Sequence, residues 1–171
     1  MDQLTQVPLT LCTSYAALAA GTTTTFSTTG ATLYAIKGIA YTTSAAANAA
    51  TPTTDARTGA AFVQVPLGYG SVFVFCYDGS STTAATAIKV VQGSIEVLDN
   101  GASTDGSAGF AKNAPAFPAI PDNLCPFGYL VVKVGTSGTA FTFGVSNLAT
   151  VSNVVKSFKS VMTMPPRPVA A

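Results

Sequence analysis

One seven-residue run, from Ser71 to Tyr77, constrains the fold of this chain more than any other segment. It reads SVFVFCY, so β-branched and aromatic residues stand on both alternating faces of the strand that they predict. A strand that is apolar on both faces has to be covered on both sides, because an open face would expose hydrophobic surface to water. Asp78-Gly79 follows directly and is a turn signal. The run therefore predicts a central strand between two layers.

Further strand signals recur at short spacing and are separated by glycine, proline and asparagine. We expect strands within 31–42, 61–67, 130–134, 140–145 and 154–162, and a strand pair or one bulged strand over 86–98. The segments 130–134 and 140–145 are expected to form a hairpin, while the alanine-rich segments 16–20 and 45–50 each predict a short helical turn. Many short strands with frequent turns are typical of an all-β fold, an antiparallel β-sandwich or barrel of jelly-roll-like type.

The ends of the chain and one internal segment lack a strand pattern. We expect an extended N-terminal arm over 1–30, the β-sandwich or barrel domain over 31–162, and an extended, proline-rich C-terminal arm over 163–171. Proline lacks the amide hydrogen that an inner strand donates, so the tail cannot be an inner strand. The internal segment, 101–121, is rich in Gly, Ser, Ala and Pro and predicts a long surface loop.

Charged side chains are scarce. Asp, Glu, Lys and Arg make up 9% of the 171 residues, and the formal net charge is +1, whereas soluble domains carry roughly 25% charged residues. Either the surface is neutral and solvated by hydroxyl groups, or much of it is covered in a permanent assembly, since the centres of protein interfaces are depleted of charge. We favour the assembly. The eight Lys and Arg residues are scattered, and no apolar run is long enough to span a bilayer, so we expect neither a nucleic-acid nor a membrane partner.

The residues that most enzymes rely on are largely missing. The chain has no histidine, which excludes Ser-His-Asp and Cys-His catalysis and every metal site that needs histidine. Glu96 is the single glutamate, and the three cysteines, an odd number without a CxxC motif, fit a reducing cytoplasm better than a disulfide framework. Asp99, Asp105 and Asp122 lack the spacing of a calcium loop, and we interpret the first two as turn formers. We therefore expect no enzyme, no cofactor and no metal site.

Two segments carry a resemblance to a known class of protein. Residues 117–134 read FPAIPDNLCPFGYLVVKV, and residues 139–148 read TAFTFGVSNL. Together they resemble small virion structural proteins of tailed bacteriophages, in which a proline-rich linker leads into a Pro-hydrophobe-Gly corner, a strand and a hairpin. The resemblance implies a capsid decoration (cement) or head-fibre subunit that binds the major capsid protein lattice and stabilises the head. It also implies a virion component made in the host cytoplasm and a homo-oligomer, with a trimer expected by analogy.

In this interpretation the two proline-rich segments, 101–121 and 162–171, are arms that extend over a neighbouring subunit and provide the expected contacts. The contact residues are Pro115, Phe117, Pro118, Ile120 and Pro121 in the loop, and Met164, Pro165, Pro166, Arg167 and Pro168 in the tail. Three alternatives stay open: a tail-associated phage protein, a secreted bacterial surface or pilus-like subunit, and a small carbohydrate-binding sandwich. Processing near Ala20 would indicate the secreted subunit. The carbohydrate-binding sandwich would need exposed aromatic side chains above a groove.

Overall fold

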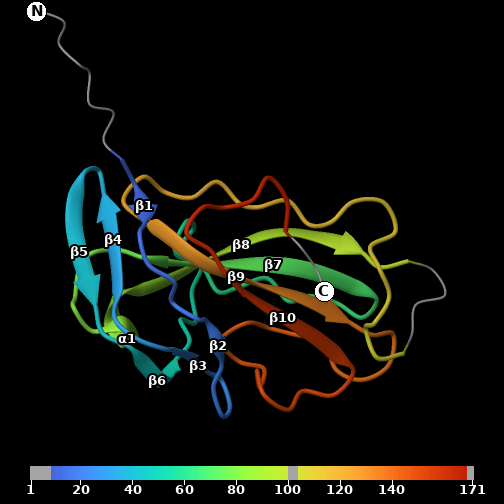
Figure 1. Ribbon diagram of the computed structural model, residues 1–171. Helices are drawn as coiled ribbons and strands as arrows, with labels where there is room; N and C mark the ends of the chain where they lie inside the picture. The colour runs from blue at the N-terminus through green and yellow to red at the C-terminus, as the bar shows by residue number, and fades with distance from the viewer. Residues whose placement is uncertain (1–8, 100–103, 169–171) are drawn as a thin grey trace, which may run out of the picture.

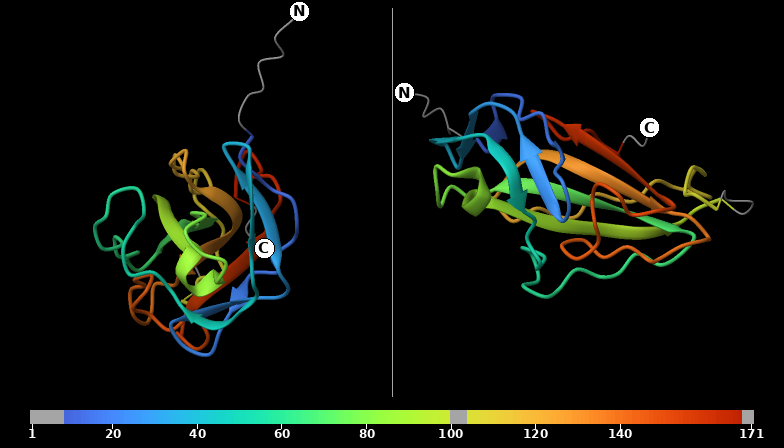
Figure 2. Two further views of the ribbon diagram at one scale, coloured as in Figure 1. Left: turned by 90° about the vertical axis from the view of Figure 1, so that its left-hand side faces the viewer. Right: turned by 90° about the horizontal axis from the view of Figure 1, so that it is seen from below.

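The computed structural model describes residues 9–99 and 104–168, and the chain within these ranges is an all-β antiparallel sandwich, as the sequence predicts. One layer is a four-stranded sheet of order β10-β9-β7-β8. Two three-stranded sheets, of order β1-β4-β5 and β2-β3-β6, pack on one face of it (Figures 1 and 2). The short helix α1 (Ala84–Ala87) directly precedes β8.

The strands of the large sheet are long, whereas those of the small sheets have two to five residues. The large sheet contains β7 (Tyr69–Tyr77), β8 (Ile88–Val97), β9 (Cys125–Val134) and β10 (Val154–Ser160). The small sheets contain β1 (Leu11–Cys12), β4 (Thr32–Ile36) and β5 (Ile39–Thr43), and β2 (Ala19–Ala20), β3 (Thr25–Thr28) and β6 (Ala46–Ala50).

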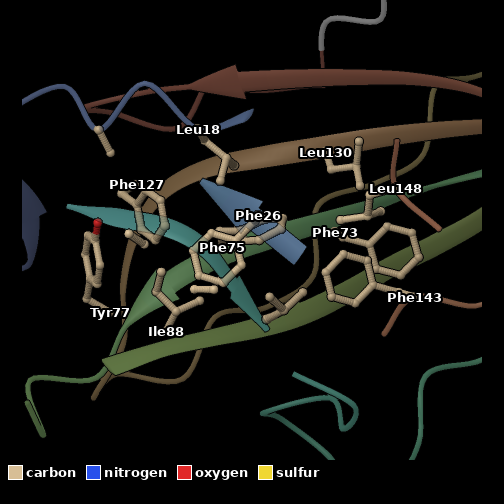
Figure 3. Close-up of a cluster of buried hydrophobic side chains, with 14 of the residues drawn as sticks. Leu18, Phe26, Phe73, Phe75, Tyr77, Ile88, Phe127, Leu130, Phe143 and Leu148 are labelled. Carbon is tan, nitrogen blue, oxygen red and sulfur yellow. The ribbon is translucent and has the colours of Figure 1, made fainter. Parts of the chain in front are cut away.

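The apolar run at 71–77 forms the centre of the large sheet. It lies in β7, which pairs antiparallel with β8 on one side and with β9 on the other, and every residue of the run is buried. Its alternate residues Phe73, Phe75 and Tyr77 face the two small sheets and contribute to the main core, where aromatic rings pack edge to face and in stacks (Figure 3). The prediction of a central strand covered on both faces is confirmed.

The N-terminal arm predicted over 1–30 is wrong for residues 11–28. This stretch forms β1, β2 and β3, and its apolar residues Cys12, Leu18 and Phe26 are buried in the main core. The strands are short and rich in threonine and alanine, so their signal is weak without the large sheet against which they pack. Residues 1–8 of the predicted arm lie outside the described residues.

Several local predictions are corrected in the same way. β9 pairs with β7 and β10 instead of forming a hairpin with 140–145, where Phe141 makes only an isolated bridge to Val65. The segment 61–67 likewise contains bridges and no strand, and the alanine-rich segments contribute β2 and β6 where helical turns were expected. Over 86–98 the bulged strand is confirmed, because Ser71 pairs with Ile95 while Phe73 pairs with Gln92.

Candidate interaction surface

The second face of the large sheet is covered by irregular chain. Its apolar side chains come from the alternate residues Val72, Val74 and Cys76 of β7 and from neighbouring strands. The covering side chains come mostly from two segments, 104–124 and 161–168, which we call the strap. Both segments of the strap run along the same side of the sheet in Figure 1. The strap contains all ten residues that the sequence predicts as subunit contacts.

The bulge in β8 anchors the first segment of the strap. Val72 of β7 faces two residues of β8, Gly93 and Ser94, and this leaves the Ser94 N–H free to bond outward, while the Ser94 carbonyl oxygen accepts from Ser71 Oγ. The Ser94 N–H donates to the Ala116 carbonyl oxygen at 3.3 Å, and the Ala116 N–H donates to Ser94 Oγ at 2.8 Å. A side chain at Gly93 would collide with the Ala116 carbonyl oxygen, so glycine is what allows this approach.

Aromatic and aliphatic side chains fix the strap onto the sheet. The ring of Phe117 lies edge-on to that of Tyr129, with 5.1 Å between the ring centroids and an interplanar angle of 75°. Ile120 and Met164 pack against the same cluster, and Pro115 is buried. The burial of apolar surface is the main stabilising contribution in the strap, because its two segments form few hydrogen bonds of the β-ladder type.

The tail lies beside the loop and completes the strap. Arg167 Nη1 donates to Asn113 Oδ1 at 3.3 Å, and Pro168 is buried. Pro115, Phe117, Pro166 and Arg167 come together around a hollow of about 420 Å³, which Glu96 also lines. Ile120 and Pro121 line a different hollow of about 390 Å³, together with Lys37. The structure therefore gathers the predicted contact residues into one surface with two hollows.

The extended geometry predicted for these contact residues is wrong. An arm that reaches a neighbouring subunit would leave its own domain, whereas Phe117, Ile120 and Met164 cover the second face of the chain's own sheet. The large sheet has apolar residues on both faces. The small sheets cover one face, so the irregular segments have to cover the second face. Pro166 and Arg167 are exposed on the outside of the strap. Their contact with another subunit stays a prediction.

A second irregular segment, 52–63, is held at the outer edge of β8 by a buried carboxylate. Asp55 Oδ1 accepts from the backbone N–H of Arg57 at 2.8 Å and of Thr58 at 3.2 Å, and Asp55 Oδ2 accepts from the Gln92 N–H at 2.8 Å. The Gln92 side chain in turn exchanges two hydrogen bonds with the backbone of Val63. The Asp55 carboxylate therefore binds backbone amides at this edge. Its hydrogen bond with Arg57 is to the backbone N–H of that residue.

The described residues offer little for catalysis or metal binding. Within 9–99 and 104–168, no three side chains of the metal-ligating types come together, and Asp105 instead accepts from the Ser107 N–H at 3.0 Å in a turn. The three cysteines are free and buried. Burial raises the pKa of the Cys125 thiol to about 12 and that of Cys76 well above the usual value, so these thiols are protonated and weakly nucleophilic at neutral pH. No helix in the described ranges has the length and apolar character needed to cross a membrane.

No family model, curated protein or solved structure matches this chain.

The exposed surface carries the most informative feature for function. Ten large apolar side chains are exposed among the described residues, and four of them, Leu9, Tyr15, Leu33 and Ile39, lie on or beside the small sheet β1-β4-β5. No pattern in the sequence predicts these four as a group. The sequence carries only a partial signal, because the apolar pattern of 31–42 is interrupted at Lys37-Gly38, which fits the two strands of a hairpin.

Proposed function

We propose that this chain is a non-enzymatic structural subunit of a tailed-bacteriophage virion, of the capsid decoration type, that binds the major capsid protein lattice. The observation that carries the proposal is that ten large apolar side chains are exposed among the described residues of a chain with 9% charged residues. Exposed large apolar side chains mark contact surfaces where they gather, and a scarcity of charge is typical of the centre of a protein interface. The resemblance of 117–134 and 139–148 to small virion proteins supports the phage assignment.

The physical properties of the surface suit this role. Contacts between neutral, shape-matched surfaces depend little on ionic strength, whereas exposed ion pairs are screened by salt. On a repeating lattice, several weak contacts from one oligomer combine, so each contact need not be strong. The strap offers Pro166 and Arg167 at its outer side as further contacts.

Labelling of particles tests the proposal directly. Antibodies against the purified chain, applied to particles isolated from a producing culture, are expected to decorate the head at regular spacing. Label confined to the tail would favour the tail-associated alternative. Absence of the chain from particles, or an intact mass that shows processing near Ala20, would overturn the phage assignment in favour of a secreted subunit.

A pair of variants tests the contribution of the strap. Arg167→Ala removes an exposed guanidinium on the strap, and Arg57→Ala makes the same change at an exposed position on the segment 52–63. Incorporation into particles is expected to fall for Arg167→Ala and to stay at the wild-type level for Arg57→Ala. Truncation after Met162 is less informative, because it also removes Met164 and Pro168 from the cover of the chain's own sheet. Equal incorporation of both variants would remove Arg167 from the contact.

A further inference from the structure

The strand β5 has one edge without a partner strand among the described residues. It follows β4 through the two-residue turn Lys37-Gly38, where both residues have positive φ (51° and 80°), as in the type I′ turns of β-hairpins. The order β1-β4-β5 leaves β5 outermost, and Figure 1 shows it at the margin of the molecule. The Ser44 N–H donates to the Thr82 carbonyl oxygen at 2.7 Å, so the free edge ends at Thr43.

The backbone groups on this edge can be assigned from the register. The Thr13 N–H donates to the Leu33 carbonyl oxygen at 2.9 Å, so Leu33 directs its backbone groups toward β1 and the next residue of β4 directs them toward β5. Tyr41 lies opposite that next residue and bonds back to β4. Ala40 and Thr42 therefore direct their N–H and C=O groups outward. Within the described ranges, none of these four groups has a hydrogen-bond partner.

A row of stacked aromatic rings ends at the same edge. The centroids of Phe127 and Tyr77 are 4.1 Å apart, those of Tyr77 and Tyr34 are 4.7 Å apart, and those of Tyr34 and Tyr41 are 5.5 Å apart. The interplanar angles are 17°, 21° and 17°, so the row runs from the large sheet across β4 to β5. The last ring, that of Tyr41, is half-buried.

β5 also contains neither of the two residue types, lysine and proline, that commonly protect an edge strand. Edge strands are commonly protected by lysine, by proline or by a covering segment. No Asp, Glu, Lys or Arg occurs from 38 to 54, and Ile39 at the start of β5 is 60% exposed. An uncharged strand with free amide and carbonyl groups is a template for another strand.

We propose that β5 pairs antiparallel with β5 of a second copy, about a two-fold axis at Tyr41. This pairing names a partner for the proposed structural subunit and rests on that proposed function. In this arrangement Ala40 of one copy stands opposite Thr42 of the other, so the four outward groups of each copy bond to those of its partner. The two Tyr41 rings come side by side on one face and continue the aromatic row across the junction.

The distribution of charge favours this orientation and a second copy as partner. Lys37 is the charged residue of the β4–β5 hairpin, at its turn. Antiparallel pairing about Tyr41 places the two Lys37 residues at opposite ends, roughly 27 Å apart at ~3.4 Å per residue, whereas a parallel pair would place them together. That separation exceeds the screening length of about 8 Å at physiological ionic strength, so the two charges do not oppose the pairing. The resulting symmetry is two-fold and differs from the trimer implied by the resemblance.

Sedimentation equilibrium of the full chain over a wide concentration range tests the pairing. A five-residue strand pair buries less than a standard interface, so we expect a reversible dimer that forms at high concentration. Ala40→Pro removes an outward amide hydrogen that has no partner within the described chain, so the domain keeps its own hydrogen bonds while the dimer weakens at least tenfold. Leu33→Lys is the control for surface charge, because it charges the exposed face of β4 opposite Thr42 and leaves the backbone groups of the β5 edge unchanged.

The outcomes separate the edge from other surfaces. A dimer that is weakened by Ala40→Pro and retained by Leu33→Lys supports the proposal. A wild-type monomer at all concentrations, a trimer, or a dimer lost only in Leu33→Lys overturns it. If Ala40→Pro fails to fold by circular dichroism, Thr42→Lys supplies the same test with an exposed charge on the edge. Particle labelling does not depend on dimer formation, so failure of the pairing and failure of the proposed function are distinguishable.

Discussion

At the scale of single residues, the cross-strand pair Thr32 and Thr43 shows how one hydroxyl group can stabilise and another can destabilise the fold. The two residues lie opposite each other in β4 and β5, and both are buried. Thr32 Oγ1 accepts from the Tyr77 hydroxyl at 3.2 Å. Thr43 Oγ1 has no hydrogen-bond partner among the described residues. A buried polar group without a partner loses its hydration without compensation.

Thr43→Val is therefore expected to raise the free energy of unfolding by about 1 kcal/mol, because a methyl group replaces an unpaired buried hydroxyl of similar size. Thr32→Val is expected to lower it by about 1–2 kcal/mol, since the Tyr77 hydroxyl then loses its acceptor. Urea unfolding followed by circular dichroism measures both changes. Changes of the same sign in the two variants would contradict the assignment of hydrogen-bond partners.

At the scale of elements, the bulge in β8 determines whether the strap can lie on the sheet. A methyl group at Gly93 would collide with the Ala116 carbonyl oxygen and with Val72 Cγ1, both at the centre of the anchor. Gly109, in the same strap, has open space where a methyl group would be placed. The same Gly-to-Ala change at these two positions therefore tests the anchor, because only the change at Gly93 produces a collision.

Gly93→Ala is expected to detach the segment around 114–118 and to increase its amide hydrogen exchange, with a loss of about 1–3 kcal/mol in the free energy of unfolding. Gly109→Ala is expected to leave both quantities close to those of the wild type. Hydrogen exchange measured by mass spectrometry resolves the segment. Unchanged protection of the strap in Gly93→Ala would show that the bulge is not its anchor.

At the scale of the whole molecule, buried tyrosines and cysteines make the free energy of unfolding depend on pH in the alkaline range. Burial raises the pKa of Tyr34 and that of Cys125 to about 12, and it also raises the pKa of Tyr77 and Cys76. The folded state therefore holds these protons more tightly than the unfolded state, in which cysteine ionises near 9.0 and tyrosine near 10.0. The stabilisation is complete below about pH 9 and is lost as the pH rises towards about 12.

The free energy of unfolding is thus expected to decrease steadily over this alkaline range, as measured by urea titrations followed by circular dichroism. Burial lowers the pKa of Lys156, which acts in the opposite direction, but it is one group against several. Tyr34→Phe keeps the ring and removes its ionisation, so its stability should decrease less steeply. A free energy of unfolding that stays constant over the range would refute the coupling between burial and ionisation.

The candidate surface shows how far sequence reasoning reaches. The composition of 101–121 and 163–168 predicts segments without regular strands, and the described part of both agrees. The prediction that these segments extend away from the domain was wrong, because the composition of a proline-rich segment does not say whether it extends from the domain or packs on it. The edge of β5 was missed for a related reason. Strand signals in 31–42 do not say which strand will lie outermost.

By itself, the sequence determined the all-β class and the buried central strand at 71–77, and it narrowed 86–98 to a strand pair or one bulged strand, because these follow from local patterns of apolar, β-branched and glycine residues. Only the tertiary structure decided that 11–28 belong to the core, that β9 pairs with β10, and that the strap covers the second face. Those outcomes depend on which apolar surfaces remain uncovered once the large sheet has formed, and that is a property of the assembled chain.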